Sequence, residues 1–271
     1  MTSPVEFTVL GSGTMLPDAK HHSSSHFLDA GTERLLLDCG PGTLHSLEAF
    51  AVPWENLTHI VLSHFHTDHI GDLPGLFFAL KYALPVRRHE PLAVVGPEGL
   101  YKRFGHLASA FGDHIRDPGF EVQLVELGEG DVWETDHSVL RAHPTPHTER
   151  SLCFRWEGRG REVGYTGDTG PSDEVARFLE GCDLVVAECA HGDPPGTDIH
   201  LSPRSLAEMA GLMRPDLLLV THVYPPGTTE EAARLVGEAG WAGRAEGARD
   251  GTRVRLLDDG PELVHPGTPA S

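Results

Sequence analysis

One short segment concentrates residue types that bind metal ions. Residues 62–69 read LSHFHTDH and place His64, His66, Asp68 and His69 directly after an apolar run. Neutral imidazole and carboxylate are suitable ligands for Zn²⁺ and related divalent ions. A polar turn with solvated histidines is the alternative, but four ligand-type residues within six positions form a far more specific pattern than a lone histidine. The segment therefore predicts a metal site in a loop that leaves a strand.

Further candidate donors follow other apolar runs. Asp168 and His222 each come directly after a predicted strand, and the carboxyl ends of strands converge on one edge of an open α/β sheet. Asp38 occupies the same kind of position, where a turn or helix cap is as good an interpretation as support of a ligand. His147 follows another predicted strand and could complete the set, although His143 competes with it.

The elements that must position these groups alternate between short apolar runs and stretches with helical spacing. Strands are expected at residues 5–10, 34–37, 58–62, 92–95, 120–127, 139–143, 162–165, 184–187, 217–220 and 252–256. Helices are expected at residues 42–50, 73–84, 100–111, 173–179, 203–213 and 230–239. No linker or repeat divides the chain, so the pattern predicts a single α/β domain over residues 1–271, with a frayed Gly/Pro-rich tail at 260–271.

Composition argues against several classes of protein. Asp and Glu number 40 against 21 Lys and Arg, and the formal charge of −19 disfavours a broad nucleic-acid surface. No run approaches the roughly 20 apolar residues of a membrane span, and residues 1–7 lack the pattern of a signal peptide, so we expect a soluble cytoplasmic protein. Cys39, Cys153, Cys182 and Cys189 form no Cys-x-x-Cys pair and are expected to be small buried residues.

In order and type, the motifs resemble those of the metallo-β-lactamase superfamily, in the branch of ribonuclease Z and related phosphodiesterases. The shared motifs span nearly the whole chain and include LGSGT at 10–14, LDCGPGT at 37–43, HFHTDH at 64–69 and YTGDT at 165–169. The resemblance implies a four-layer αββα sandwich of two mixed sheets, with two metal ions at one rim of the sheets.

The resemblance also implies the ligands. Metal one would be bound by His64, His66 and His147, metal two by Asp68, His69 and His222, and Asp168 would bridge them. The expected cofactor is two Zn²⁺ per chain, with Mn²⁺ or Fe²⁺ as alternatives. A water between two such cations becomes hydroxide near neutral pH, which implies hydrolysis with Asp68 also among the catalytic residues. Iron-binding redox relatives typically have Glu in place of His66, and antibiotic-degrading relatives generally have Cys in place of Asp168, so neither chemistry is expected.

The substrate is indicated by Glu188 and His200. Their context resembles the ribonuclease Z pattern in which a Glu at a strand end supports a His just before a helix, and this His protonates the leaving oxygen near the scissile phosphate. A carboxylate raises the pKa of an adjacent imidazole and fixes its ring, which suits a general acid. The alternative for His200 is an ordinary loop residue near a helix cap. Together the pair favours phosphodiesters over thioesters or lactones.

Two features argue against transfer RNA processing. The processing enzymes usually carry a long basic arm between the third histidine motif and the bridging Asp, whereas only 21 positions separate His147 from Asp168 here. The negative charge offers no general phosphate-binding surface. One modest basic cluster lies beside the site loop, and a solvated helix face is its simpler interpretation. Its members are Lys81, Arg87, Arg88, Lys102 and Arg103.

The function expected from the sequence is therefore a dinuclear zinc phosphodiesterase that acts on a small or flexible phosphodiester, with cyclic nucleotides among the candidates. A ribonuclease Z-type transfer RNA 3′-end endonuclease is the alternative. A thioester or lactone hydrolase and a metal-binding protein without turnover rank below both. The apolar run at 73–80 has more large side chains than one helix stripe requires, which predicts a homodimer, with core burial as the competing explanation.

Overall fold

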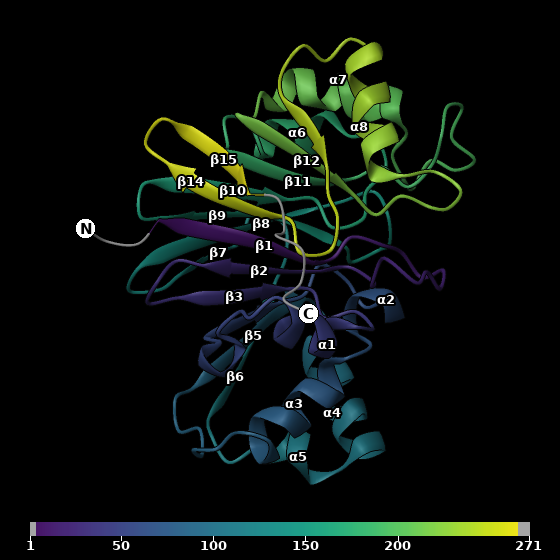
Figure 1. Ribbon diagram of the computed structural model, residues 1–271. Coiled ribbons are helices and arrows are strands. Elements are labelled where there is room, and N and C mark those ends of the chain that lie inside the picture. Colours follow the sequence, from purple (N-terminus) through teal and green to yellow (C-terminus); the bar gives the residue numbers. More distant parts are fainter. Residues whose placement is uncertain (1–3, 265–271) are drawn as a thin grey trace.

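The computed structural model describes residues 4–264. Two β-sheets lie in the middle of the molecule, and helices cover them on both sides (Figure 1). The expected αββα sandwich of two mixed sheets is confirmed. None of the helices in the described part of the chain has the length and apolarity that crossing a membrane requires.

The first sheet has eight strands and is built mainly from the amino-terminal half of the chain. Its spatial order is β15 (Gly260–Val264), β14 (Arg253–Leu257), β1 (Val5–Gly11), β2 (Ser25–Asp29), β3 (Arg34–Leu37), β4 (His59–Val61), β5 (Leu92–Pro97) and β6 (Val122–Leu127). The four strands from β3 to β6 are parallel, and the other neighbours are antiparallel. The parallel half thus directs the loops after β3, β4 and β5 to one edge.

The second sheet has seven strands. Its spatial order is β13 (Ala245–Gly247), β12 (Leu217–Thr221), β11 (Leu184–Glu188), β10 (Arg161–Tyr165), β9 (Leu152–Gly158), β8 (Ser138–Pro144) and β7 (Val132–Glu134). Strands β10 to β13 are parallel, so the residues that follow β10, β11 and β12 also leave the sheet at a common edge.

The helices form two groups, one for each sheet (Figure 1). The group on the first sheet contains α1 (Thr43–Ala49), α2 (Thr67–Ile70), α3 (Leu73–Tyr82), α4 (Leu100–Phe111) and α5 (Asp113–Arg116), with a 3₁₀ turn at Trp54–Asn56. The group on the second sheet contains α6 (Asp173–Phe178), α7 (Pro203–Met213) and α8 (Thr229–Glu238). Ser202 caps α7 by accepting a hydrogen bond from the Ser205 amide, and Pro203 stands at the first helical position.

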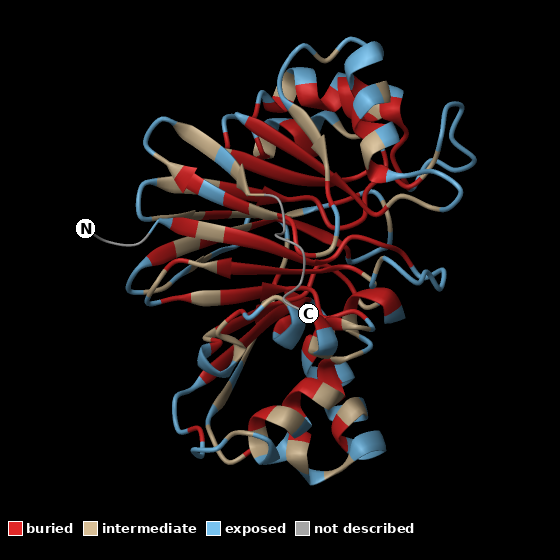
Figure 2. Cartoon of the chain, viewed as in Figure 1, coloured by how far each residue is buried: buried red, intermediate tan, exposed pale blue. Residues whose placement is uncertain are grey.

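Apolar side chains fill three layers. One core lies between the two sheets and includes Phe7, Phe154 and Trp156. The other two lie between each sheet and its helices. The central strands are therefore buried on both faces, as the red strands of Figure 2 show, and this is why they read as continuous apolar runs rather than alternating ones. All four cysteines are free and buried, as expected.

Most elements lie where the sequence predicts them, and α4 and α7 have the predicted bounds. The tail differs from expectation, because Gly260–Val264 form β15 and pair with β14 rather than fraying. The remainder of the expected tail, residues 265–271, lies outside the described residues. Strand β2 was also not predicted, because its residues SHFLD show neither a continuous apolar run nor clean alternation.

Candidate metal centre

The predicted donors meet at one edge of the sandwich, although they come from both sheets. Two of the predicted ligands lie in the loop after β4 and two in the short helix α2, and the others follow β8, β10 and β12. In chain order they are His64, His66, Asp68, His69, His147, Asp168 and His222. Strand geometry therefore brings together groups that are more than 150 positions apart in the sequence.

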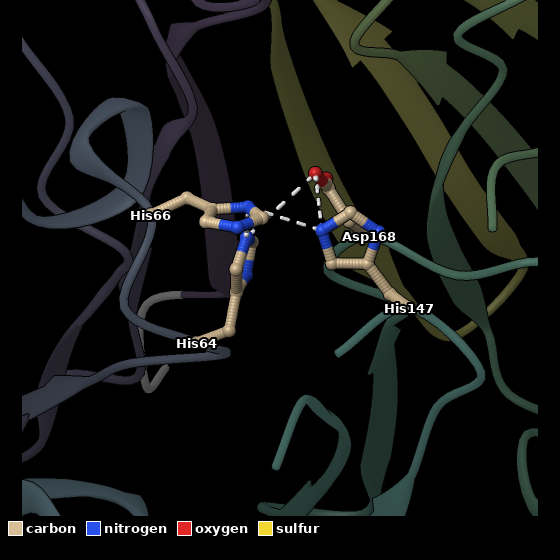
Figure 3. Close-up of side chains that lie close together, drawn as sticks. All are labelled: His64, His66, His147 and Asp168. Carbon is tan, nitrogen blue, oxygen red and sulfur yellow. Dashed lines mark hydrogen bonds and ion pairs between the residues drawn. The ribbon is translucent and has the colours of Figure 1, made fainter. Parts of the chain in front are cut away.

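The first cluster consists of three histidines and one carboxylate (Figure 3). His66 Nδ1 lies 3.0 Å from His64 Nε2 and 3.1 Å from His147 Nε2. Asp168 Oδ2 lies 3.8 Å from His64 Nε2 and 3.6 Å from His147 Nε2. One donor atom from each of these residues falls within 4.8 Å of all the others, a spacing that one metal ion could span.

The second cluster lies on the other side of the same Asp168 carboxylate. Asp168 Oδ1 lies 3.3 Å from His69 Nε2 and 3.6 Å from His222 Nε2. Asp68 Oδ2 approaches the same two nitrogens at 3.8 and 3.5 Å. The two oxygens of Asp168 therefore face different clusters, which is the arrangement that a bridging ligand requires.

The chemistry of these atoms fits metal ions. His69 Nε2, His222 Nε2 and Asp168 Oδ1 are buried, and within residues 4–264 they have no hydrogen-bond partner. Buried polar atoms without a partner are costly, and imidazole and carboxylate groups that converge without protein partners suit a divalent cation.

The protonation states of His64 and Asp168 agree with this fit. Burial lowers the pKa of His64 far below its usual range, so the ring is neutral, which is the form that binds metal. Burial opposes ionisation of Asp168, but the neighbouring charges of His222 and His69 outweigh it and hold the pKa of this carboxyl well below its usual range. The carboxylate is therefore ionised and available as a ligand.

Asp38 supports the second cluster instead of capping a helix. Its Oδ2 accepts hydrogen bonds from His69 Nδ1 at 2.7 Å, Ser63 Oγ at 2.7 Å and Tyr165 Oη at 2.6 Å. Its Oδ1 accepts one from the Ser63 amide at 2.7 Å. Because Nδ1 of His69 is held by Asp38, Nε2 is directed toward the cluster. From the sequence the role of Asp38 was open, and no spacing pointed to Tyr165 as its partner.

Glu188 and His200 form a buried pair beside the ligands. Glu188 Oε1 accepts from His200 Nδ1 at 2.8 Å, and the carboxylate also accepts from the amides of Thr169, Ala190 and Leu201. Burial lowers the pKa of His200, but the hydrogen bond and charge of Glu188 outweigh this effect and the pKa is raised. The ring of His200 lies 4.7 Å from that of His147, and one of its nitrogens lies within 4.8 Å of donor atoms of Asp168 and His222, so His200 directly adjoins the proposed ligands.

The structure separates His147 from its competitor. His147 Nδ1 donates to the carbonyl of Ile199 at 3.1 Å, which leaves Nε2 facing the cluster. His143 instead stacks on Phe178 at 5.3 Å and belongs to none of the groups that could bind a metal among the described residues.

An aromatic pair that the sequence did not indicate lines the same region. Tyr224 stacks on His191 with ring centroids 5.5 Å apart, and its ring lies 5.9 Å from that of His222. Only the position of Tyr224 two residues after a predicted ligand could have suggested its place. The pair forms an aromatic surface on the His222 side of the centre.

The five basic residues of the predicted cluster do not form one group in the structure. Arg88 is buried and donates to the carbonyls of Glu55, Leu57, Glu90 and Pro91, so it is structural. Lys81 and Arg87 donate to the carbonyls of Asp117 and Gly119. Only Lys102 and Arg103 line a cavity that also contains ligand histidines.

The two mixed sheets and the histidine and aspartate cluster at their common edge define a metal-dependent hydrolase. Residues 33–223 match the family model of the β-lactamase superfamily domain, and the chain belongs to the metallo-β-lactamase superfamily. This confirms the family resemblance found in the motifs.

Relatives and solved structures agree with this membership. The chain is 30% identical to ribonuclease Z of Mycobacterium bovis over 278 positions, which cover 93% of this chain and 98% of that protein. The metallo-β-lactamase fold protein YhfI from Bacillus subtilis superimposes with a TM-score of 0.80 at 24% identity, over 93% of this chain and 99% of that one. The short form of human tRNase Z gives a TM-score of 0.75 at 21% identity, with the same coverage.

Proposed function

We propose that the chain is a phosphodiesterase that uses two divalent metal ions, zinc in the first instance, to hydrolyse a small or flexible phosphodiester. The observation that carries the proposal is the Glu188–His200 pair, a hydrogen-bonded acid and imidazole directly beside the candidate metal centre. Hydrolysis of a thioester needs a proton donor less, because the leaving thiolate is stable. Hydrolysis of a lactone also needs one less, because the leaving alkoxide stays attached to the product. A phosphodiester with a poor leaving group benefits from a positioned proton donor.

The two clusters divide the metal ligands between them. One ion would be held by His64, His66 and His147, the other by Asp68, His69 and His222, with Asp168 shared. When bound, two such ions activate water and stabilise the charge that develops on the phosphate. Asp68 has 11% of its side chain exposed against 3% for Asp168, so of the two carboxylates it is the one that substrate or water can reach.

His200 supplies the proton in this proposal. Its Nδ1 is engaged by Glu188, which leaves Nε2 as the atom that holds the proton for the leaving oxygen. Glu188 is itself fixed by three backbone amides, so the imidazole has a rigid support. The raised pKa of His200 keeps this imidazole protonated over a wider pH range than a free histidine.

A second candidate is a transfer RNA 3′-end endonuclease, because the relative in Mycobacterium bovis that spans nearly the whole chain is named ribonuclease Z. Against it, only β9 and β10 with short turns lie between His147 and Asp168, so no arm is present there, and the formal charge is −19. A cytoplasmic location stays a prediction for either function.

The deciding experiment assays purified protein of measured metal content on four substrates in parallel. These are bis(p-nitrophenyl) phosphate, a cyclic nucleotide, a thioester and a precursor transfer RNA. Hydrolysis of the small diesters, absent in a matched Asp168→Ala variant, supports the phosphodiesterase. Rapid precursor cleavage with no turnover of the small diesters would replace it with the endonuclease.

A further inference from the structure

A cavity of about 610 Å³ opens directly beside the metal centre. His64 and His66 form part of its wall, and the amino-terminal half of α4 forms another part. The metal ligands and the exposed residues of α4 therefore face one shared space. Nothing in the proposed chemistry uses this space beyond the two histidines.

The cavity carries three basic side chains that are exposed and in reach of a ligand. They are Lys102, Arg103 and Arg150. Arg103 lies over the ring of Phe65, with its guanidinium carbon 5.3 Å from the ring centroid, and Phe65 stands between the two ligand histidines in the sequence. This contact directs the Arg103 guanidinium over the residue that joins His64 and His66, in the cavity that these two histidines also line.

Two carboxylates share the cavity, and they do not cancel the basic groups. Glu98 pairs with Arg150 at 3.5 Å, and Glu149 also lines the wall. Within residues 4–264, neither Lys102 nor Arg103 has a carboxylate at 4.0 Å or less. Two unpaired cations thus remain next to the centre, in a chain whose formal charge is −19.

We propose that this cavity is a subsite for a second phosphate group of the substrate, one that neighbours the scissile diester. The inference rests on the proposed phosphodiesterase function and specifies its substrate class as a diester that bears an additional phosphate. Guanidinium and ammonium groups are the side chains that bind phosphate oxygens through charge-assisted hydrogen bonds. Lys102 and Arg103 are the specificity-determining residues, and the metal centre acts on the neighbouring phosphate.

The kinetic test compares two substrates that differ by one phosphate. They are thymidine 5′-(p-nitrophenyl phosphate) and the same compound with a 3′-phosphate. Because two exposed charge pairs each contribute modestly, we expect kcat/KM to be about tenfold higher for the 3′-phosphorylated substrate. The ratio should fall to about threefold in Lys102→Gln and in Arg103→Gln, and approach one in the double variant, because each single variant keeps one of the two charges. Arg87→Gln changes a basic residue outside the cavity and should keep the wild-type ratio.

A binding measurement separates failure of the subsite from failure of the proposed function. Calorimetry on the metal-loaded protein compares thymidine 3′,5′-bisphosphate with thymidine 5′-phosphate. Tighter binding of the bisphosphate that is reduced in Lys102→Gln and lost in the Lys102→Gln/Arg103→Gln double variant supports the subsite, even if neither diester is hydrolysed. Absence of hydrolysis would contradict only the phosphodiesterase. Hydrolysis of both diesters at equal kcat/KM, or equal binding of the two nucleotides by the wild-type protein, would overturn the subsite and leave the phosphodiesterase standing.

Discussion

Replacement of His200 by Ala separates proton donation from metal binding. The proposed donor is buried, with 8% of its surface exposed, and among the described residues its one side-chain hydrogen-bond partner is Glu188 at 2.8 Å. A positioned general acid contributes roughly 10²- to 10⁴-fold to rate. We therefore expect kcat to fall by about this factor for thymidine 5′-(methyl phosphate), whose leaving methoxide needs a proton. The defect should be much smaller for thymidine 5′-(p-nitrophenyl phosphate), because p-nitrophenolate leaves unaided.

The same variant should fold and bind metal normally. When the imidazole is removed, Glu188 Oε1 keeps its hydrogen bond from the Thr169 amide at 2.7 Å, and Oε2 keeps those from Ala190 and Leu201. The loss is therefore one hydrogen bond to a charged group, about 1.5–3 kcal/mol, together with the packing of a buried ring against His147 and Tyr224. Elemental analysis and urea unfolding check both statements. Equal rate defects on the two leaving groups, or loss of metal, would refute the assignment of His200 as a proton donor.

Replacement of Glu188 by Gln tests whether both carboxylate oxygens accept hydrogen bonds from the backbone. Each oxygen of Glu188 accepts at least one backbone N–H, so the amide group of Gln would face a donor in either orientation. We expect this variant to lose about 1–3 kcal/mol of stability and to show a smaller rate defect of the same kind as His200→Ala, larger for the methyl diester than for the p-nitrophenyl diester. Wild-type stability would show that the carboxylate is not held as described.

The other predictions concern metal, acid stability and assembly. Asp168→Ala should reduce the metal content, measured by elemental analysis, from about two ions per chain to none, and a wild-type content of one or less after reconstitution would contradict the dinuclear centre. Asp38→Asn should weaken metal binding by about 10- to 100-fold in a chelator competition, because it places an amide where the carboxylate holds His69; unchanged affinity would contradict this role. Burial, with the charges of nearby histidines, lowers the pKa of His26 from 6.5 to about 3. Between pH 6.5 and about 3, His26 is therefore protonated in the unfolded chain and neutral in the folded chain. Wild-type stability relative to His26→Leu should therefore fall by about 1.4 kcal/mol per pH unit over that window, and parallel urea-unfolding profiles would contradict it. Phe78, 54% exposed on α3, should support a homodimer that Phe78→Glu dissociates in sedimentation, and a monomeric wild-type protein at micromolar concentration would refute this.

The fold was largely predictable where local pattern and burial agree. Helices α4 and α7 have a single apolar stripe and clear ends, and the parallel strands are continuous apolar runs. Strand β2 was not predictable, because Ser25 and His26 are polar yet completely buried. Their burial follows from packing between sheets, for example the stacking of His26 on Phe7, and no local pattern in the sequence encodes that.

The donor residues of the candidate site were predictable from the sequence, but the hydrogen bonds of Asp38 and Tyr165 that orient one of them were not. Strand ends and motif order brought the proposed ligands into one set, but His143 and His147 differ by only four positions and share the same chemistry. Strand register decides between them, since His143 belongs to β8 and packs on Phe178, while His147 lies in the loop beyond it. The roles of Asp38 and Tyr165 depend on a contact between sheets, which sequence spacing does not reveal.

That contact links the packing of the fold to the metal centre. Tyr165 ends β10 in the second sheet, and its hydroxyl donates to Asp38, which follows β3 in the first sheet and holds His69. Three residues further on, Asp168 faces the nitrogens of His69 and His64, which both come from the first sheet. A shift of one sheet against the other would therefore move Asp168 away from its partners and break the hydrogen bond that orients His69. Because both sheets supply donors to each cluster, correct packing of the sandwich is a condition for assembling either metal site.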